Sequence, residues 1–428
     1  MFLFFVRHFN DIDHLTPIAW KLLKADESVA VYGMNARYDF WSDYRIRFLQ
    51  KEGARVEDLA REFEHLHGRG CRWMHSFMAH CFRTERGLRQ RHGAGARRGV
   101  LWTAFLIGAI GTLFYKITRR FYYREKSARQ ILLRRRAQLL CFDHIMPAHY
   151  VVGTFLEAAR ALAIPSVALP HGVLLYTNEA TKEKSGRQRR HQKFSRYDQI
   201  VVPNALRKNA LINSGVPAAK ITLLGSARYC AEWMHQNWKI MPKKIPDRLT
   251  ETDDLKVVFF PSKPQCNVDL DRLAASLERL AAIEGIQLLV KPHTRAATHV
   301  DLPVSPRLQD ATHVLTAELC HWADAVLVVG SSVVTEALVR GKPALYLQYL
   351  HSNTTLFEEL NACWTIGDED ALQGAIEALR KNKRQIPYQA QDVDRYLKAV
   401  VQGDREAADV LGGYRDFLVA TAKQAPAA

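Results

Sequence analysis

The sequence predicts an α/β protein built from two doubly wound parallel sheets, and three observations support this class. Short apolar segments of strand length alternate with amphipathic segments of helix length along most of the chain, a pattern typical of parallel sheets covered by helices. The alternation stops in a stretch rich in Lys, Pro and Met between Trp233 and Asp253 and then restarts, which indicates a linker. The length of 428 residues suits two domains that each bury a core.

We therefore expect an N-terminal domain over residues 1–243 and a C-terminal domain over residues 254–390, with C-terminal helices over residues 391–428 that pack back on the N-terminal domain. Ligands of doubly wound sheets bind beyond the carboxyl ends of the strands. With two such domains, the cleft between them is the expected site.

The individual elements follow from local apolar patterns. In the first half, strands are predicted at 1–6, 29–32, 138–142, 166–169, 199–202 and 221–224, and helices at 14–23, over most of 41–83, at 151–163 and at 205–214. In the second half, strands are predicted at 257–260, 286–290, 325–329 and 344–347, and helices at 270–283 and 332–339.

One apolar segment interrupts the alternation in the first half. Residues 99–115 form a run of 17 residues without a charged side chain, with basic residues on both flanks. As a helix the run would be roughly 25 Å long, at the short limit for a bilayer core of about 30 Å. A single span is impossible if the strands before and after it share one sheet. We therefore expect the segment 99–116 to lie in a membrane interface as a helix or hairpin; a buried core helix is the alternative.

Charge and cysteine content narrow the partners. Of the net charge of +16, the segment from Arg83 to Arg136 carries 15 Lys or Arg against two Glu, so the rest of the chain is nearly neutral. Such a local patch favours an anionic membrane surface over nucleic acid.

The seven cysteines are scattered without a CxxC pair, which suggests neither a zinc site nor a disulfide framework. We expect a cytoplasmic protein, peripheral on the inner face of the cell membrane.

Candidate phosphate-binding residues follow the predicted strands of the second domain. The strand 325–329 runs into Gly330, Ser331 and Ser332 and then a helix with Glu336. Small residues and free N–H groups at such a turn suit a phosphate, and Glu336 is placed to reach ribose hydroxyls. The alternative is that Ser332 only caps the helix.

Further cations follow neighbouring strands. Lys291, His293 and Arg295 come after the strand 286–290 and suit a phosphate leaving group; the alternative for His293 is a structural histidine. The other candidate donor-binding residues are Ser262 and Lys263, after the first strand of the second domain, and Arg228, in the segment Gly225–Tyr229.

Candidates for a general base lie in the first domain. Asp11, Asp13 and His14 follow the first strand, and His171 follows the strand 166–169 in the sequence Pro-His-Gly. Each is expected to face the cleft, although Asp13 alternatively caps the first helix. The segment from Asp11 to Asp13 also spells the DxD of metal-dependent transferases, but it precedes any complete nucleotide-binding unit, so we discount it.

The order of these motifs over residues 137–347 resembles GT-B glycosyltransferases of bacterial surface polysaccharides. That group includes capsule-type Kdo transferases, CDP-glycerol glycerophosphotransferases and bacterial sialyltransferases. The matching pieces are Leu-Pro-His-Gly at 169–172, Leu-Gly-Ser-Ala-Arg-Tyr at 224–229, Val-Lys-Pro-His-Thr at 290–294, Gly-Ser-Ser at 330–332, Glu-Ala at 336–337 and Gly-Lys-Pro at 341–343.

The resemblance implies that His293, Ser331 and Ser332 bind the donor's phosphate, although Thr294 stands where the family has proline. It also implies no bound metal and no cofactor beyond a nucleotide-sugar co-substrate. We expect transfer of a sugar from a nucleotide-activated donor to a lipid-linked or growing surface glycan, and the resemblance includes cytidine-linked donors. The alternatives are a CDP-glycerol-type phosphotransferase, a UDP-sugar 2-epimerase and a non-enzymatic membrane-binding protein.

Overall fold

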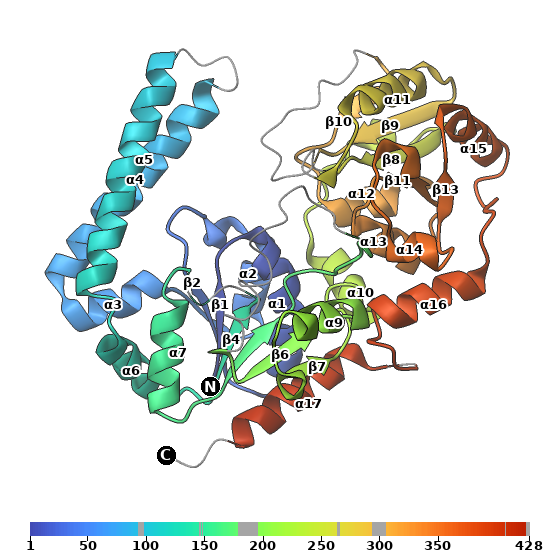
Figure 1. Ribbon diagram of the computed structural model, residues 1–428. Helices are drawn as coiled ribbons and strands as arrows, with labels where there is room; N and C mark the ends of the chain where they lie inside the picture. The colour runs from blue at the N-terminus through green and yellow to red at the C-terminus, as the bar shows by residue number, and fades with distance from the viewer. Residues whose placement is uncertain are drawn as a thin grey trace.

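Two parallel sheets form the frame of the protein (Figure 1). The computed structural model describes residues 1–92, 98–144, 147, 149–178, 196–262, 266–292, 305–406 and 408–424. The first sheet has the strand order β3-β2-β1-β4-β5-β6-β7, with every neighbouring pair parallel. Its strands are β1 (Phe2–Val6), β2 (Val29–Gly33), β3 (Arg55–Asp58), β4 (Leu139–Asp143), β5 (Ser166–Leu169), β6 (Gln199–Val202) and β7 (Ile221–Leu223).

The second sheet repeats the design in the C-terminal half. Its order is β10-β9-β8-β11-β12-β13, again with parallel pairs throughout. Its strands are β8 (Leu255–Phe260), β9 (Ile286–Val290), β10 (Leu308–Asp310), β11 (Ala325–Val328), β12 (Ala344–Leu347) and β13 (Trp364–Ile366).

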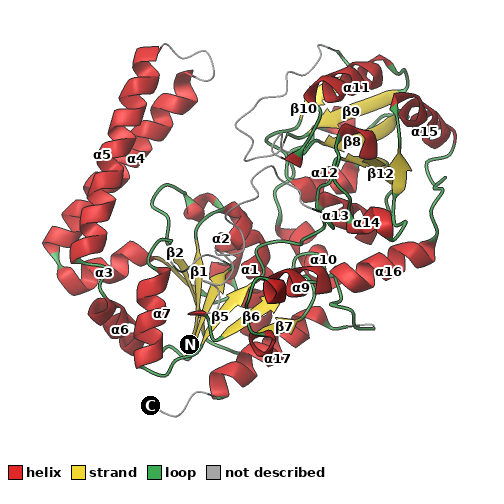
Figure 2. Ribbon diagram, viewed as in Figure 1, coloured by secondary structure: helices red, strands yellow, loops and turns green. Residues whose placement is uncertain are grey.

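Helices cover both faces of each sheet (Figure 2). The alternation of side chains along β1 shows why: Phe2, Phe4 and Val6 join one buried cluster, whereas Leu3 and Phe5 join another on the opposite face. Because both faces of such a strand are buried, its sequence is a continuous run of apolar residues. The N-terminal helices are α1 (Phe9–Leu23), α2 (Tyr44–Lys51), α3 (Leu59–His67), α4 (Arg69–His92), α5 (Arg98–Phe121), α6 (Glu125–Arg134), α7 (Val152–Ala161), α9 (Ala205–Asn213) and α10 (Ala231–Ile240).

The C-terminal helices cover the second sheet, and the two halves of the protein share a buried cluster. One buried cluster runs through both halves, since it contains Phe4 of β1 as well as Val258 of β8 and Val326 of β11. The helices are α11 (Leu270–Ala282), α12 (Thr316–Trp322), α13 (Val333–Val339), α14 (Leu356–Glu359), α15 (Glu369–Lys381), α16 (Ala390–Val400) and α17 (Val410–Lys423).

The chain returns to the first half at its end. The backbone N–H of Ser226 donates to the Val401 carbonyl at 2.9 Å, and Tyr414 in α17 donates to the Gly225 carbonyl at 2.7 Å. Gly225 has φ +85°, and a Cβ there would lie 2.1 Å from the Val401 oxygen. Only glycine allows this close approach.

Helices α4 and α5 pack against each other as an antiparallel hairpin that projects from the first domain (Figure 1). The apolar segment expected at 99–116 lies within α5. The strands β1–β3 before the hairpin and β4–β7 after it belong to one sheet. Both ends of the hairpin therefore lie on the same side, and a single crossing of a membrane is excluded.

Several predicted elements need correction. The first helix begins at Phe9 and not at residue 14, because the extended chain at His8 leads directly into it. The region 41–83 is interrupted by β3, whose sequence Arg-Val-Glu-Asp has one buried apolar side chain and therefore lacks a strand pattern. The predicted linker begins later, because α10 continues to Ile240 and buries Trp233 against Trp20. The edge strands β10 and β13 were not predicted, because each has three residues of which only one is buried.

Candidate active site

Polar side chains gather where each sheet reverses its strand order. In the first sheet β1 and β4 are neighbours, although β2 and β3 lie on one side and β5–β7 on the other. In the second sheet the corresponding neighbours are β8 and β11. Ligands of doubly wound sheets bind in the crevice beyond the carboxyl ends of such strands.

A cavity of about 720 Å³ lies between the two domains at these reversals. Both domains contribute to its walls, as expected of a cleft that holds a small-molecule ligand. It is lined by His8, Phe9, Asn10, Tyr38, Arg228, Phe260, Pro261, Lys291, Pro292, Thr312, His313, Val314, Leu315, Thr316, Ser331, Ser332 and Val333.

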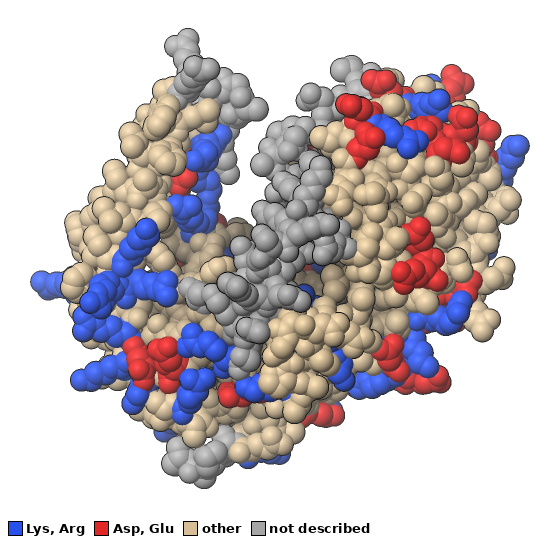
Figure 3. All heavy atoms as spheres, in the orientation of Figure 1, with Lys and Arg blue, Asp and Glu red and all other residues tan. Residues whose placement is uncertain are grey.

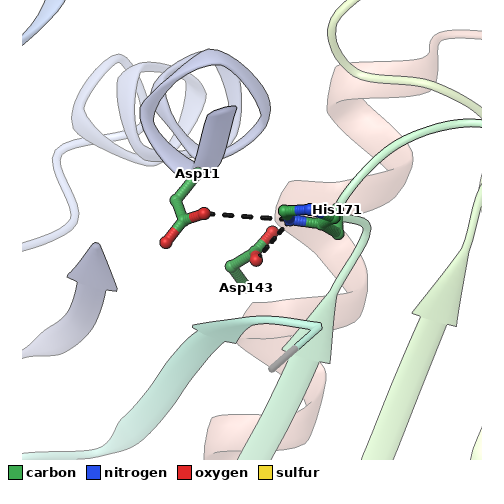
Figure 4. Close-up of side chains that lie close together, drawn as sticks. All are labelled: Asp11, Asp143 and His171. Carbon is green, nitrogen blue, oxygen red and sulfur yellow. Dashed lines mark hydrogen bonds and ion pairs between the residues drawn. The ribbon is translucent and has the colours of Figure 1, made fainter. Parts of the chain in front are cut away.

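Two carboxylates and a histidine converge beyond β1 and β4 (Figure 4). Asp143 ends β4, and its Oδ2 lies 2.6 Å from Nδ1 of His171, which follows β5. Asp11, in the first turn of α1, lies 3.8 Å from the same His171 nitrogen. The Arg7 guanidinium joins both acids: its Nε donates to Asp11 at 2.7 Å, and its Nη2 donates to Asp143. Sequence reasoning selected Asp11 and His171 but missed Arg7 and Asp143.

His8 connects this cluster to the cavity. It lines the cavity wall, and its Nδ1 lies 3.1 Å from Asp11 Oδ1. Its ring centre is 6.0 Å from that of His171. Asn10 holds the second histidine in place, since its amide donates to the His171 carbonyl at 2.6 Å. A carboxylate beside an imidazole stabilises the protonated form of the ring.

The environment of Asp11 favours proton sharing. Burial and the neighbouring Asp143 carboxylate raise the pKa of Asp11 above its ordinary value, against the opposite effect of Arg7. A carboxylate with a raised pKa has a higher proton affinity, so Asp11 interacts strongly with a proton that binds to His8. The arrangement can therefore take a proton from a hydroxyl or carbon acid in the cavity.

Asp13, the other predicted base, is held in an arginine network. Its Oδ1 accepts from Arg45 Nη1 at 2.5 Å, and its Oδ2 lies 2.8 Å from Arg228 Nη1. Arg45 is fully buried and also binds Asp43 at 2.7 Å. Asp13 lies in the second turn of α1, so it does not cap the helix. Both oxygens of Asp13 are therefore engaged by guanidinium groups, and Asp13 does not line the cavity.

Arg228 brings a cation to the cavity beside the two serines. Burial acts against its charge, but Asp13 raises the pKa of the guanidinium above its ordinary value. Ser331 and Ser332 line the same cavity, and the hydroxyl of Tyr229 donates to Ser332 Oγ at 3.3 Å. The helix that follows has only seven residues. The groups at this turn with the chemistry to bind an anion are therefore Arg228 and the hydroxyls rather than a helix dipole.

Gly330 allows the N-terminal domain to reach this turn. It has φ +62°, and a Cβ there would lie 2.4 Å from the Tyr176 hydroxyl. The Tyr176 segment also pairs with the second domain, since the Thr177 N–H donates to the Thr354 carbonyl at 3.0 Å. The serine turn is thus fixed by both domains.

Lys291 lines the cavity, but its ammonium group is engaged. Its Nζ donates to the carbonyls of Thr312 at 2.9 Å and Val314 at 2.5 Å. Burial lowers its pKa to about 8. Lys291 therefore positions the loop 312–316, which forms part of the cavity wall, and has little freedom to bind a phosphate directly.

The remaining predicted residues are placed as follows. Glu336 is buried, does not line the cavity, and accepts from Arg340 at 3.3 Å. His14 is buried against Pro170 and Gly172, outside the cavity. Ser262 directly follows Pro261 of the cavity wall. Lys263, His293 and Arg295 lie outside the described residues.

The cluster of Asp11, Asp143 and His171 has ligand atoms within 4.8 Å of one another. This chemistry fits a divalent cation in principle. Here, however, the Arg7 guanidinium already occupies the space between the two carboxylates. The arginine would have to leave before a cation could bind to both carboxylates.

Among the residues that line the site, His8, Asn10 and Asp143 carried a weak signal in the sequence. His8 and Asn10 lie in the polar segment after the first strand, and Asp143 directly follows the strand predicted at 138–142. Their position after strands was the available clue. Their convergence depends on the strand order, which the sequence did not specify.

No family model and no curated protein matches this chain. Solved structures do. The UDP-N-acetylglucosamine 2-epimerase from Rickettsia bellii matches with a TM-score of 0.55 and 11% identity, over 99% of this chain and 96% of that chain. The UDP-GlcNAc 2-epimerase from Neisseria meningitidis, bound to UDP-GlcNAc, matches with a TM-score of 0.54 and 11% identity, over 98% and 99%. The calicheamicin glycosyltransferase CalG4 gives a TM-score of 0.48 and 13% identity, over 99% of each chain.

These similarities extend over whole chains at low identity, so they concern the fold. The chain has the GT-B arrangement of two Rossmann-like domains that face a cleft, as the sequence predicts. The closer resemblance to capsule Kdo transferases and their relatives stays a prediction.

Proposed function

We propose that this protein is a glycosyltransferase that moves a sugar from a nucleotide-activated donor to a hydroxyl acceptor. One observation carries the proposal. The interdomain cavity is lined by His8, which pairs with the buried Asp11, and also by Arg228, Ser331 and Ser332. A base and an anion-binding group that line the same cavity are what displacement of a phosphate by a hydroxyl needs.

The donor is assigned to the wall formed by Arg228 and the two serines. A guanidinium and hydroxyl groups suit the phosphate of a nucleotide sugar. The bound UDP-GlcNAc in the Neisseria meningitidis epimerase supports a nucleotide-sugar ligand for a protein of this fold. The loop 312–316, held by Lys291, would then lie beside the nucleoside.

The acceptor is assigned to the N-terminal domain. A second pocket of about 210 Å³ adjoins the histidine cluster and is lined in part by His144, His171 and Arg207. His8 takes the proton from the acceptor hydroxyl while the acceptor oxygen bonds to the sugar's anomeric carbon. The bond from that carbon to the phosphate oxygen breaks, and the nucleotide leaves with its charge beside Arg228. Asp11 stabilises the imidazolium that forms.

A second candidate is a UDP-sugar 2-epimerase, which one observation favours. His8 with Asp11 and His171 with Asp143 form two imidazole–carboxylate pairs whose rings are 6.0 Å apart. Epimerisation requires removal of a carbon-bound proton and its return on the other face of the sugar, so two such groups serve it. The solved epimerases share the fold.

The test begins with thermal-shift screening against CMP, CDP, UDP and GDP, since a ligand of the native state raises the melting temperature. The sugar nucleotide of the stabilising base is then incubated with the enzyme in D₂O. A glycosyltransferase releases nucleotide only when acceptor glycan is added, and it leaves the donor free of deuterium. Deuterium at C2 of the donor without acceptor would instead establish the epimerase. If none of the four nucleotides stabilises the protein, both candidates fail.

A further inference from the structure

The α4–α5 hairpin exposes a concentration of large apolar side chains. Of the 13 large hydrophobic residues that are exposed in the described part of the chain, eight lie on this hairpin. Trp102 is 63% exposed, Phe105 56% and Leu113 55%. Soluble surfaces rarely gather such residues, so a contiguous patch marks an interaction site. The eight are Trp73, Leu101, Trp102, Phe105, Leu106, Ile110, Leu113 and Phe121.

This patch is not the face that packs helix on helix. The seam of the hairpin uses small residues of α5, including the buried Gly108 and Gly111. A Cβ at Gly108 would lie 2.6 Å from Glu85 Cδ, and one at Gly111 would lie 2.8 Å from Phe82 Cε1. Close packing at the seam leaves the larger apolar side chains of α5 on the opposite side.

The side of the hairpin that faces the body of the protein is polar. Arg37, from the loop after β2, donates to Thr112 Oγ1 at 2.9 Å, and its guanidinium lies 4.4 Å from the Phe82 ring centre. Helix α4 itself carries exposed arginines, among them Arg83 and Arg89. The hairpin is therefore amphipathic as a unit, with its apolar side on α5.

Cations lie where the apolar face meets the rest of the domain. Lys116, Arg119 and Arg120 are exposed in the last turns of α5, and Arg72 is exposed near the start of the antiparallel α4. Figure 3 shows Lys and Arg gathered at the foot of the hairpin, below a face of neutral side chains. This arrangement complements a bilayer, whose apolar interior is bordered by anionic phosphates.

Helix α5 is long and apolar enough to cross a membrane, and only 17% of its most apolar window is buried. The strand order nevertheless excludes a single span, as described above. The arginines of α4 also oppose immersion of the complete hairpin in hydrocarbon. The remaining solution is a helix that lies in the plane of one leaflet.

We propose that the α4–α5 hairpin is a monotopic anchor for an anionic lipid bilayer. The exposed face of α5, with Trp73 of α4 beside it, lies in the interface, the cations at its foot contact lipid phosphates, and the side of α4 with the exposed arginines faces water. The anchor does not depend on which reaction the cleft performs. If the proposed function also holds, the acceptor is membrane-borne, because Tyr38 of the cavity wall directly follows Arg37, which binds α5.

Vesicle flotation tests the apolar contact. The full-length protein should float with vesicles of phosphatidylcholine and 30% phosphatidylglycerol. The double variant Phe105→Glu with Ile110→Glu should bind at least 10-fold more weakly, because two charges would enter the interface. The matched control is Leu270→Glu with Ile386→Glu, which adds the same charges at exposed apolar positions of the second domain. This control should float like the parent.

The outcome is decisive in each direction. Circular dichroism first establishes that both variants fold. A folded Phe105→Glu/Ile110→Glu protein that floats like the parent overturns the proposal. It is also overturned if the parent floats with no vesicle and instead sediments as a dimer that this variant dissociates, because the face would then bind a second copy.

The electrostatic contact has its own test. Replacing Lys116, Arg119 and Arg120 together by glutamine should lower the partition into anionic vesicles by up to about 100-fold, given about 1 kcal/mol for each cation near the surface. Raising the ionic strength should weaken binding of the parent for the same reason. Equal binding of the parent to neutral and anionic vesicles at low salt would contradict the role of these cations.

Discussion

Asp11 and Asp13 lie two residues apart on α1, yet they belong to opposite kinds of environment. Asp11 contacts Arg7, His8 and His171, and burial with Asp143 nearby raises its pKa. Asp13 instead forms ion pairs with Arg45 and Arg228.

The difference follows from the turn of the helix. Residues two apart on an α-helix point about 200° apart, so Asp11 meets the ends of β1 and β4 whereas Asp13 meets α2 and the segment with Arg228. One aspartate can therefore serve proton transfer, and the other joins elements of the fold. Three predictions test this division, and a fourth concerns Lys291 on the cavity wall.

Removal of the cavity-facing base should have the largest effect. We expect His8→Ala to lower turnover by about 10²- to 10⁴-fold, the usual contribution of a general base. Binding of the product nucleotide, measured by calorimetry, should change little, because the base acts on the acceptor side. His14→Gln is the matched control, since His14 lies outside the cavity, on the helix that directly follows His8. Equal losses in both variants would refute the assignment of His8.

Asp13→Asn should act mainly on stability. The change leaves two buried guanidinium groups with less compensation, and removal of one partner from a buried ion pair costs about 3–5 kcal/mol. Denaturant unfolding should show a lower midpoint. Asp11→Asn is the matched substitution and should reduce turnover more than stability. If Asp13→Asn mainly lowers turnover and Asp11→Asn mainly lowers stability, the two aspartates do not have these roles.

Arg228 links Asp13 to the cavity, because it forms an ion pair with Asp13 and also lines the cavity wall. Arg228→Met should weaken binding of the nucleotide identified by thermal shift by roughly 10- to 150-fold, corresponding to about 1.5–3 kcal/mol for a charge-assisted hydrogen bond. Arg228→Lys should recover only part of the affinity, because lysine lacks the planar fork. Unchanged affinity in Arg228→Met would place the phosphate elsewhere.

The smallest expected effect concerns Lys291 and pH. Its pKa is about 8 in the folded protein, below the ordinary value of 10.5. The unfolded chain therefore holds more protons between these values, and this residue's contribution to the free energy of unfolding rises with pH. Relative to Lys291→Met, the parent should gain about 1 kcal/mol between pH 7 and pH 9. Parallel pH profiles in denaturant titrations would argue against a buried, perturbed lysine.

Much of the fold was readable from local patterns. The buried strands of both sheets are apolar runs such as Phe2–Val6 and Ala325–Val328, and the break before Leu255 separates two series of them. The edge strand β3 was not predicted, because Val56 is its only buried apolar residue. Burial of both faces produces a sequence signal, and an edge strand with polar neighbours does not.

By itself, the sequence determined the two α/β halves, the serine turn at Gly330–Ser332, the apolar segment of α5 and its basic surroundings. These are local properties, because composition and periodicity record which faces are buried. The tertiary structure alone decided that β1 lies beside β4, which brings His8, Asp11, Asp143 and His171 together from distant parts of the chain. It also decided that Asp13 faces two arginines. Strand order and the direction of a side chain depend on long-range packing, which no local pattern of residues encodes.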